Sequence, residues 1–200
     1  MKAKTILTFI LSLIFMFSAM PNYAITADEA MAKFRSRMYG AGGLSGTLSW
    51  GYETDMQYSA SFKYLPGKIY IKFSNPSGKI IVCNGRKLWV YNQANNICGV
   101  QDMAGGSGGL AGLLVGYNGI VTSQGSGGYN LKLSKPGSAY PEVILRLDST
   151  FFPRSVSLKD ASGSSLRFMI NLDSGPVMNS QFEFNVPSNA QVVKNPLEIK

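Results

Sequence analysis

Few residues of this chain have the types and spacing that catalysis or metal binding requires. The 200-residue sequence contains no histidine, which removes histidine-based triads, the usual proton shuttle and the commonest metal ligand. Cys83 and Cys98 alone cannot form a zinc site. Asp28 and Glu29 fit a helix cap. The other candidate carboxylates, at strand ends where turn roles dominate, are Asp148, Asp160 and Asp173. A lysine-activated serine or a carboxylate pair stays open, but no motif points to one, so we expect no enzyme, metal or cofactor.

The chemistry that the sequence does favour is the burial of an apolar ligand. Hydrophobic residues make up 45% of the chain and charged residues only 15%. Each buried methylene group contributes about 0.8 kcal/mol, so one long acyl chain gains on the order of 10 kcal/mol without any hydrogen bond. Aromatic walls with nearby methionines suit a dry, deformable cavity of this kind. The candidate lipid-binding residues are Met31, Phe34, Leu48, Trp50, Tyr52, Tyr58, Phe62, Tyr64, Ile69, Ile71, Phe73, Ile81, Leu88, Val90, Leu113, Leu114, Leu131 and Leu133.

Residues 67–92 predict three consecutive strands that organise these side chains. Residues 68–73 alternate strictly, which predicts a strand with Tyr70 on a wet face and Ile69 on an apolar face. Residues 75–78 have turn composition. Asn84 and Gly85 then join the runs 79–83 and 87–91, and an Asn-Gly pair in this position predicts a type I′ turn with positive φ at both residues.

A single helix is predicted at the start of the mature chain. Thr26 and Glu29 have the spacing of a capping box, and the helix runs to about Tyr39 with Met31 and Phe34 on its apolar stripe. Core packing of these two side chains is the alternative to ligand contact.

Alternation in the rest of the chain predicts an antiparallel β-sheet. The further predicted strands are 44–52, 57–64, 97–102, 129–133, 142–147, 156–159, 166–171 and 181–186. Residues 104–119 break the pattern, and because leucines lie among the glycines we expect a mobile flap with an apolar underside rather than a disordered linker. The spacing predicts an antiparallel meander or barrel that is mainly β (α+β): a curled antiparallel sheet with the N-terminal helix and the glycine-rich flap over an apolar concave face.

The predicted covers are too small for that face. One helix and one flap offer few side chains against a face this wide, which indicates an under-filled hollow. A barrel filled by its own side chains is the alternative.

The first 24 residues have the features of a secretory signal. Lys2 and Lys4 form a basic start, residues 6–17 an apolar core, and Ala24 a small residue before the cleavage site. An uncleaved membrane anchor is the alternative, but the apolar core is short for a span. We expect residues 1–24 to be removed and residues 25–200 to form one domain, monomeric and periplasmic.

The charge of the chain limits its partners. Removal of Lys2 and Lys4 would lower the formal net charge of +8 by two. The excess favours anionic lipid or an acidic partner, although a mildly basic solvated surface explains it equally well. The export signal and the lack of a basic run argue against nucleic acid.

Two cysteines in an exported chain suggest a disulfide, but the predicted strands argue against it. Cys83 should lie beside the Asn84 turn and Cys98 near Tyr91, at the other end of the sheet. A disulfide requires Cα atoms within about 7 Å, so we expect two free thiols.

The central stretch resembles the LolA-type family of periplasmic carriers that sort lipoproteins to the outer membrane. The residues that carry the resemblance are Pro66, Ile80-Ile81-Val82, Asn84-Gly85, Leu88-Trp89 and Tyr91-Asn92, with Phe182, Phe184 and Pro187 near the end. The resemblance implies an incomplete barrel closed by helices, acylated lipoproteins or free lipid as cargo, an inner-membrane ABC transporter as donor and an outer-membrane acceptor.

The resemblance also assigns two positions. It places Ile69 on the cavity wall, where the family usually has an aromatic residue. Family members carry an arginine before the proline that latches the lid, whereas this chain has Leu65. Either apolar contact alone holds the lid or the cargo differs. Three hypotheses remain: a lipoprotein carrier, a lipid- or lipoprotein-sensing regulatory module of the anti-sigma-factor-binding type, and a structural domain with a filled barrel.

Overall fold

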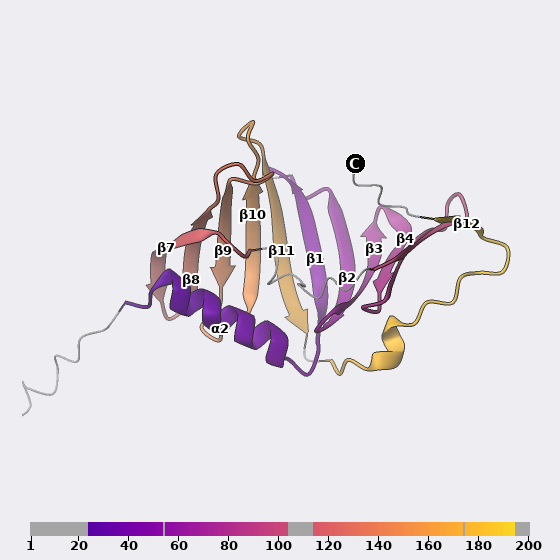
Figure 1. Ribbon diagram of the computed structural model, residues 1–200, viewed down its shortest axis with the longest axis horizontal. Helices are drawn as coiled ribbons and strands as arrows, with labels where there is room; N and C mark the ends of the chain where they lie inside the picture. Colours follow the sequence, from indigo (N-terminus) through magenta and orange to yellow (C-terminus); the bar gives the residue numbers. More distant parts are fainter. Residues whose placement is uncertain (1–23, 54, 104–113, 174, 195–200) are drawn as a thin grey trace, which may run out of the picture.

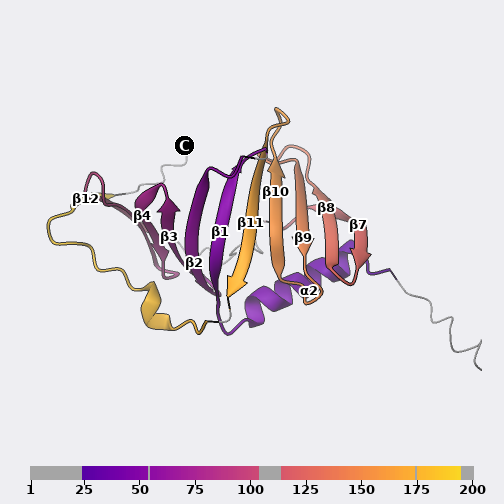
Figure 2. The ribbon, with the colours of Figure 1, turned by 180° about the vertical axis from the view of Figure 1, so that it is seen from behind.

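One curled sheet and one helix make up most of the molecule (Figure 1). The computed structural model describes residues 24–53, 55–103, 114–173 and 175–194. The sheet has twelve strands in the order β12-β6-β5-β4-β3-β2-β1-β11-β10-β9-β8-β7. It stays open, with β12 and β7 at its edges, so the predicted incomplete barrel is confirmed (Figure 2).

The element bounds follow the sequence pattern closely for most of the chain. The helix is α2 (Ala27–Gly40), and a short 3-10 helix, η1, covers Asn179–Phe182. The strands are β1 (Leu44–Tyr52), β2 (Tyr58–Leu65), β3 (Lys68–Asn75), β4 (Ser77–Cys83), β5 (Lys87–Asn92), β6 (Ile97–Asp102), β7 (Asn118–Gly125), β8 (Gly128–Ser134), β9 (Glu142–Leu147), β10 (Pro153–Lys159), β11 (Ser165–Asp173) and β12 (Gln191–Lys194). Within the described residues, no helix has both the length and the apolar character needed to cross a membrane.

The predicted capping box begins α2. The backbone N–H of Glu29 donates to Thr26 Oγ1 at 3.2 Å, and the backbone N–H of Thr26 donates to Glu29 Oε2 at 3.0 Å. Hydrogen bonds from the backbone and hydroxyl of Thr26 lower the pKa of Glu29. Both orphan donors at the helix start are thereby satisfied.

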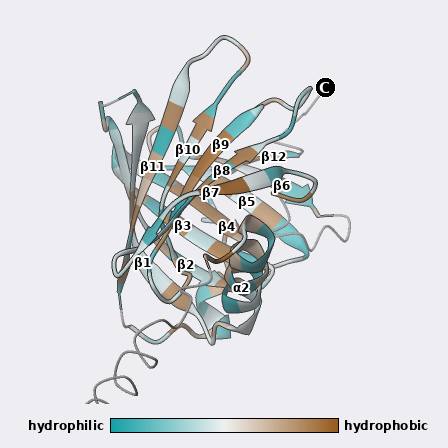
Figure 3. Ribbon diagram, turned by 90° about the vertical axis from the view of Figure 1, so that its left-hand side faces the viewer, coloured by the Kyte–Doolittle hydropathy of each residue, from teal (hydrophilic) through white to brown (hydrophobic). Residues whose placement is uncertain are grey.

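Strand register divides the sheet into two faces, because directly paired residues of neighbouring strands point to the same side. We call the face that α2 covers the inner face. It carries the row Gly46, Phe62, Ile71, Ile81 and Val90, paired one to the next from β1 to β5. Figure 3 shows the sheet curling around α2 on this side.

The helix covers one half of the inner face. Met31 and Phe34 of α2 belong to a buried cluster with the leucines of β8 and β9, among them Leu133 and Leu145. We call β7 to β11 the helix-covered half. Its inner face is sealed over β8 and β9, whereas Val156 of β10 and Phe168 of β11 are half-buried, and the buried cluster also reaches Phe62 of β2.

The other half of the sheet is covered on its opposite, outer face. Residues 176–190, which we call the C-terminal strap, place the fully buried Phe182 beside β3. The ring of Phe184 lies 6.4 Å from that of Trp89 and 5.8 Å from that of Tyr91, both on the outer face of β5. Val82, paired with Trp89, is fully buried as well.

The strap overturns two sequence predictions. Residues 181–186 were expected to form a strand, but they contain the end of η1 and then an extended segment outside the sheet. The face of Tyr70 was expected to be wet, yet Tyr70 is only half-exposed, and its pairing partner Val82 has no exposed surface. Alternation identified two faces correctly and could not show that a distant segment covers one of them.

Three smaller predictions also differ from the structure. Strands β7 and β12 were not predicted, and β12 pairs with β6 in parallel, whereas all pairing was expected to be antiparallel. The β4–β5 turn has Gly85 and Arg86 at its centre, since the backbone N–H of Asn84 donates to the carbonyl of Lys87. Gly85 has φ +88° while Asn84 is not among the residues with positive φ, a pattern typical of a type II′ turn rather than type I′.

The cysteine prediction is confirmed. Cys83 pairs with Leu88 and Cys98 with Tyr91, at opposite ends of β5, and both thiols are free. Burial raises the pKa of the Cys98 thiol, so it stays protonated and apolar in character.

Candidate lipid-binding face

The predicted lipid-binding residues fall into two groups, one in the buried cluster between α2 and the sheet and one on the less covered part of the inner face. The first group is fully packed beneath α2. Seven of the predicted side chains belong to the buried cluster: Met31, Phe34, Phe62, Tyr64, Leu114, Leu131 and Leu133. Burial and the neighbouring Tyr39 raise the pKa of Tyr64. These residues hold the helix on the sheet.

The second group lies on β1 to β5, and two of its members, Leu48 and Ile71, pack against the buried cluster. Eight predicted side chains there are half-buried: Leu48, Trp50, Tyr58, Ile69, Ile71, Phe73, Ile81 and Val90. Leu88 is buried, Tyr52 is 58% exposed, and Leu113 lies outside the described residues. The inner face is therefore mostly apolar, and it is incompletely covered on this side.

An aromatic cluster forms one end of the open part. The ring of Trp50 stacks on Tyr58 at 5.5 Å between centroids, meets Phe73 edge-on at 5.2 Å and stacks on Phe168 at 6.3 Å. All four aromatic residues are half-buried. Offset and edge-on pairs are the favoured aromatic arrangements, so this end is a formed apolar surface rather than a loose set of rings.

Two residues at this end were missed as site candidates. Phe168 had the right alternation in its predicted strand, but nothing in the sequence showed that β11 pairs with β1. Lys79 was read only as part of a strand, although its ammonium lies 5.5 Å from the centroid of the Phe73 ring. The spacing of Lys79 two residues before Ile81 was the available signal.

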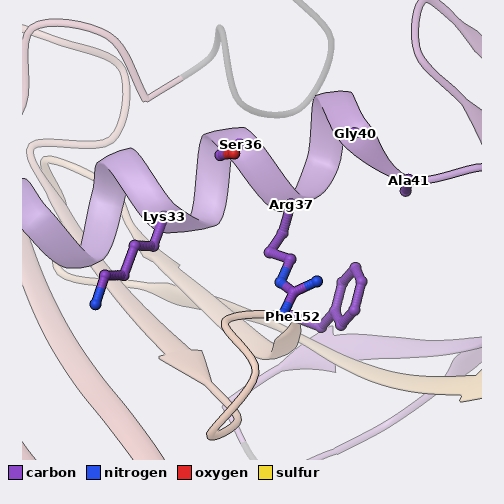
Figure 4. A pocket seen from close by; sticks show the side chains of 6 residues that line it. All are labelled: Lys33, Ser36, Arg37, Gly40, Ala41 and Phe152. Carbon is purple, nitrogen blue, oxygen red and sulfur yellow. The ribbon is translucent and has the colours of Figure 1, made fainter.

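A pocket of about 400 Å³ lies on the flank of α2 that faces the β9–β10 turn (Figure 4). It is lined by Lys33, Ser36, Arg37, Gly40, Ala41 and Phe152. The guanidinium carbon of Arg37 lies 5.8 Å from the centroid of Phe152. With two cations and a hydroxyl in its wall, this pocket differs in chemistry from the apolar inner face.

Leu65, at the position of the family's latch arginine, is half-buried at the end of β2. A Cβ placed on Gly43, just after α2, would lie 3.4 Å from Leu65 Cδ2 and 2.6 Å from Val177 Cβ. Leu65 thus lies close to both the chain leaving α2 and the strap, where only apolar contact is possible.

The described residues hold no group of three histidine, cysteine, aspartate or glutamate side chains that could bind a metal ion. Asp148 and Asp160 have turn roles, each accepting hydrogen bonds from the hydroxyl and backbone of residues that follow it.

Comparison with known proteins identifies the fold. No protein-family model matches the sequence, and no curated protein matches it. An uncharacterized conserved protein from Thermus thermophilus superposes with a TM-score of 0.62 at 14% identity, over 84% of this chain and 98% of that chain. MucB superposes with a TM-score of 0.55 at 14% identity, over 84% of this chain and 65% of MucB.

The LolA superfamily protein NE2245 from Nitrosomonas europaea also matches, with a TM-score of 0.42 at 15% identity, over 80% of this chain and 99% of that chain. The two matches with the higher TM-scores show a shared fold, and at 14% identity they show nothing beyond it.

Proposed function

We propose that this protein binds the acyl chains of lipoproteins or of free lipid on the open part of its inner face and carries them between membranes. The observation that supports the proposal is the half-buried apolar surface on β1 to β5, with the Trp50 cluster at its end. Apolar area removed from water contributes about 25 cal/mol per Å². Covering this surface with a hydrocarbon chain is therefore favourable without any specific hydrogen bond.

The proposed carrier role adds a compartment, a donor and an acceptor to this lipid binding. On the resemblance to LolA-type proteins, residues 1–24 are a cleaved signal, residues 25–200 act as a monomeric periplasmic carrier, an inner-membrane ABC transporter is the donor and an outer-membrane component is the acceptor. The packed helix-covered half would serve as a rigid frame, and the open half as the cargo surface.

The direct test places a charge on the cargo surface. Ile69 is half-buried on the inner face between its pairing partners Tyr64 and Cys83. We expect Ile69→Glu to abolish displacement of a fluorescent acyl probe by lipid, and to remove co-purifying lipid from the mass spectrum of protein isolated from its own host, because an ionised carboxylate at an apolar wall is costly to cover.

The matched control puts the same charge on the other side of the sheet. Ser61 is exposed on the outer face, where it pairs with Lys72. Ser61→Glu should bind the probe like wild type. Circular dichroism should show both variants folded, and unchanged uptake by folded Ile69→Glu would contradict the assignment of the cargo surface.

A second candidate is a regulatory module that binds another protein. The observation that favours it is a row on the outer face where Ile120, 61% exposed, and Ile144, 44% exposed, both pair with Lys132. MucB has been solved in complex with MucA(peri). A neighbouring gene for a Lol-type ABC transporter would favour the carrier, and one for an anti-sigma factor the regulator.

A further inference from the structure

Among the paired positions of the described strands, the inner face carries a single charged side chain, and it lies at the border of the proposed cargo surface. We propose that Lys79 binds the anionic headgroup of an amphiphile whose hydrocarbon chain lies on the inner face. The inference rests on the proposed lipid binding and adds a substrate class to it: lipids with a phosphate or carboxylate headgroup, held in one orientation.

The first observation is the register. Lys79 pairs with Asn92, and two residues further along β4 Ile81 pairs with both Ile71 and Val90 of the inner face, so Lys79 points to the same side. Across the described strands, every other paired inner-face position holds an uncharged residue. Lys79 therefore differs in charge from every other paired position of this face, and an anionic ligand bound at this position would explain the difference.

The second observation is where Lys79 lies. Its Nζ is 5.5 Å from the centroid of Phe73, whose ring meets Trp50 edge-on. Lys79 itself is exposed, and among the described residues no carboxylate pairs with it. Its charge therefore sits beside the aromatic end of the apolar surface, hydrated and available to an anion.

The third observation is the direction from this end toward the helix. Along β4 the inner face continues from Lys79 to Ile81, and across the sheet from Ile81 through Ile71 to the buried Phe62 under α2. An amphiphile can thus keep its headgroup at Lys79 and Asn92 while its chain runs over apolar side chains toward α2. The reverse orientation would place the charged headgroup among uncharged apolar groups.

The test compares two amphiphiles with the same chain, dodecyl phosphate and dodecyl maltoside, below their micelle-forming concentrations. The chain has two tryptophans, Trp50 and Trp89, so Trp89→Phe leaves Trp50 as the reporter of binding. In that background we expect dodecyl phosphate to bind about tenfold more tightly than dodecyl maltoside, since a charged hydrogen bond is worth about this factor.

Lys79→Gln should weaken dodecyl phosphate about tenfold and leave dodecyl maltoside unchanged. The matched control is Lys72→Gln, which removes an exposed lysine from the outer face of neighbouring β3 and should change neither affinity. The same measurements with dodecanoate show whether the site binds a carboxylate headgroup as it binds a phosphate headgroup.

The outcomes separate the inference from the function on which it rests. If Lys79→Gln and Lys72→Gln weaken dodecyl phosphate equally, or neither does, the headgroup site is overturned while binding of dodecyl maltoside still supports a lipid-binding face. If neither amphiphile perturbs Trp50 or displaces an acyl probe, the lipid-binding function itself is overturned.

Discussion

The two halves of this sheet are covered on opposite faces. In the β7–β11 half, α2 packs on the inner face and seals it over β8 and β9, where Leu131, Leu145 and their neighbours are fully buried. In the β3–β6 half, the C-terminal strap seals the outer face, where Val82 and Cys98 are fully buried. On the inner face of this second half, most side chains are only half-buried, with Leu88 of β5 an exception.

This arrangement explains how an apolar surface can remain available without unfolding the protein. A sheet needs at least one face packed against another layer to be stable. Because the strap supplies that layer from outside, β3 to β5 can leave Ile71 and Ile81 partly exposed on the inside. The strap would then stabilise the half that binds cargo, and the helix the half that does not.

The largest effect is expected from truncating Phe182, the buried side chain that packs the C-terminal strap against the sheet. Phe182 is fully buried, and Phe→Ala at such sites costs about 3–5 kcal/mol. We expect Phe182→Ala to lower the free energy of unfolding by about that amount and to speed amide hydrogen exchange in β3 to β6 more than in β8 to β10. Glu183→Ala, at an exposed position of the same strap, should do neither. Uniform acceleration in both halves would mean that the strap does not stabilise one half selectively.

The next test compares the inner face of the two halves directly. Leu133 is buried under α2, while Ile81 is half-buried on the open side. We expect Leu133→Ala to cost about 3 kcal/mol and Ile81→Ala about 1 kcal/mol of unfolding free energy, measured by urea denaturation. Lipid affinity should respond in the opposite order, with Ile81→Ala the weaker binder. Equal stability losses would contradict the difference in packing.

The same comparison shows what the sequence could predict. Strict alternation identified β1 to β3 and the inner-face position of Ile69, because period two is a local property of the chain. The Asn84-Gly85 turn between two apolar runs identified β4 and β5. The capping box fixed the start of α2 for the same reason. A curled sheet with an under-filled hollow followed from an apolar face wider than its predicted covers, and the incomplete barrel followed from the resemblance to the LolA-type family.

What the sequence could not predict depends on contacts between distant segments. Phe182 and Phe184 alternate as a strand would, yet they belong to a strap, because alternation does not reveal whether a segment has a hydrogen-bonding neighbour. Strand β12 has four residues, all exposed, and so carries no apolar pattern. For the candidate site, alternation placed residues such as Phe62 and Ile71 on one face and gave no measure of which of them α2 would bury.

A smaller effect should follow from loosening the helix itself. Thr26→Ala removes the cap of α2, and such caps are worth about 1 kcal/mol of unfolding free energy. The pKa of Glu29, now held low by the backbone and hydroxyl of Thr26, should rise, which carboxyl NMR can follow. Thr26→Ser keeps the hydroxyl and should retain both properties. If α2 only frames the fold, lipid affinity should stay the same in both variants.

The smallest effect is expected at the β9–β10 turn of the helix-covered half. Burial acts to raise the pKa of Asp148, but hydrogen bonds from Thr150 and Phe152, together with Arg154, outweigh it and hold that pKa below its usual value. The Arg154 guanidinium lies 2.8 Å from the carboxylate. Because the folded pKa is depressed, the stabilisation is fully present above the unfolded value of about 3.9 and is lost as pH falls through the folded pKa.

Asp148→Asn should therefore cost about 0.5 kcal/mol of unfolding free energy at neutral pH. The difference from wild type should shrink as the pH falls below the unfolded value of about 3.9 and through the lower folded pKa, where the wild-type carboxyl also becomes neutral. Urea denaturation at a series of pH values measures it, and Ser149→Ala, at an exposed position of the same turn, should show no such pH dependence. A difference that grows toward low pH would mean that the Asp148 carboxyl is held in its protonated form. The turn would then stabilise the helix-covered half by a different mechanism.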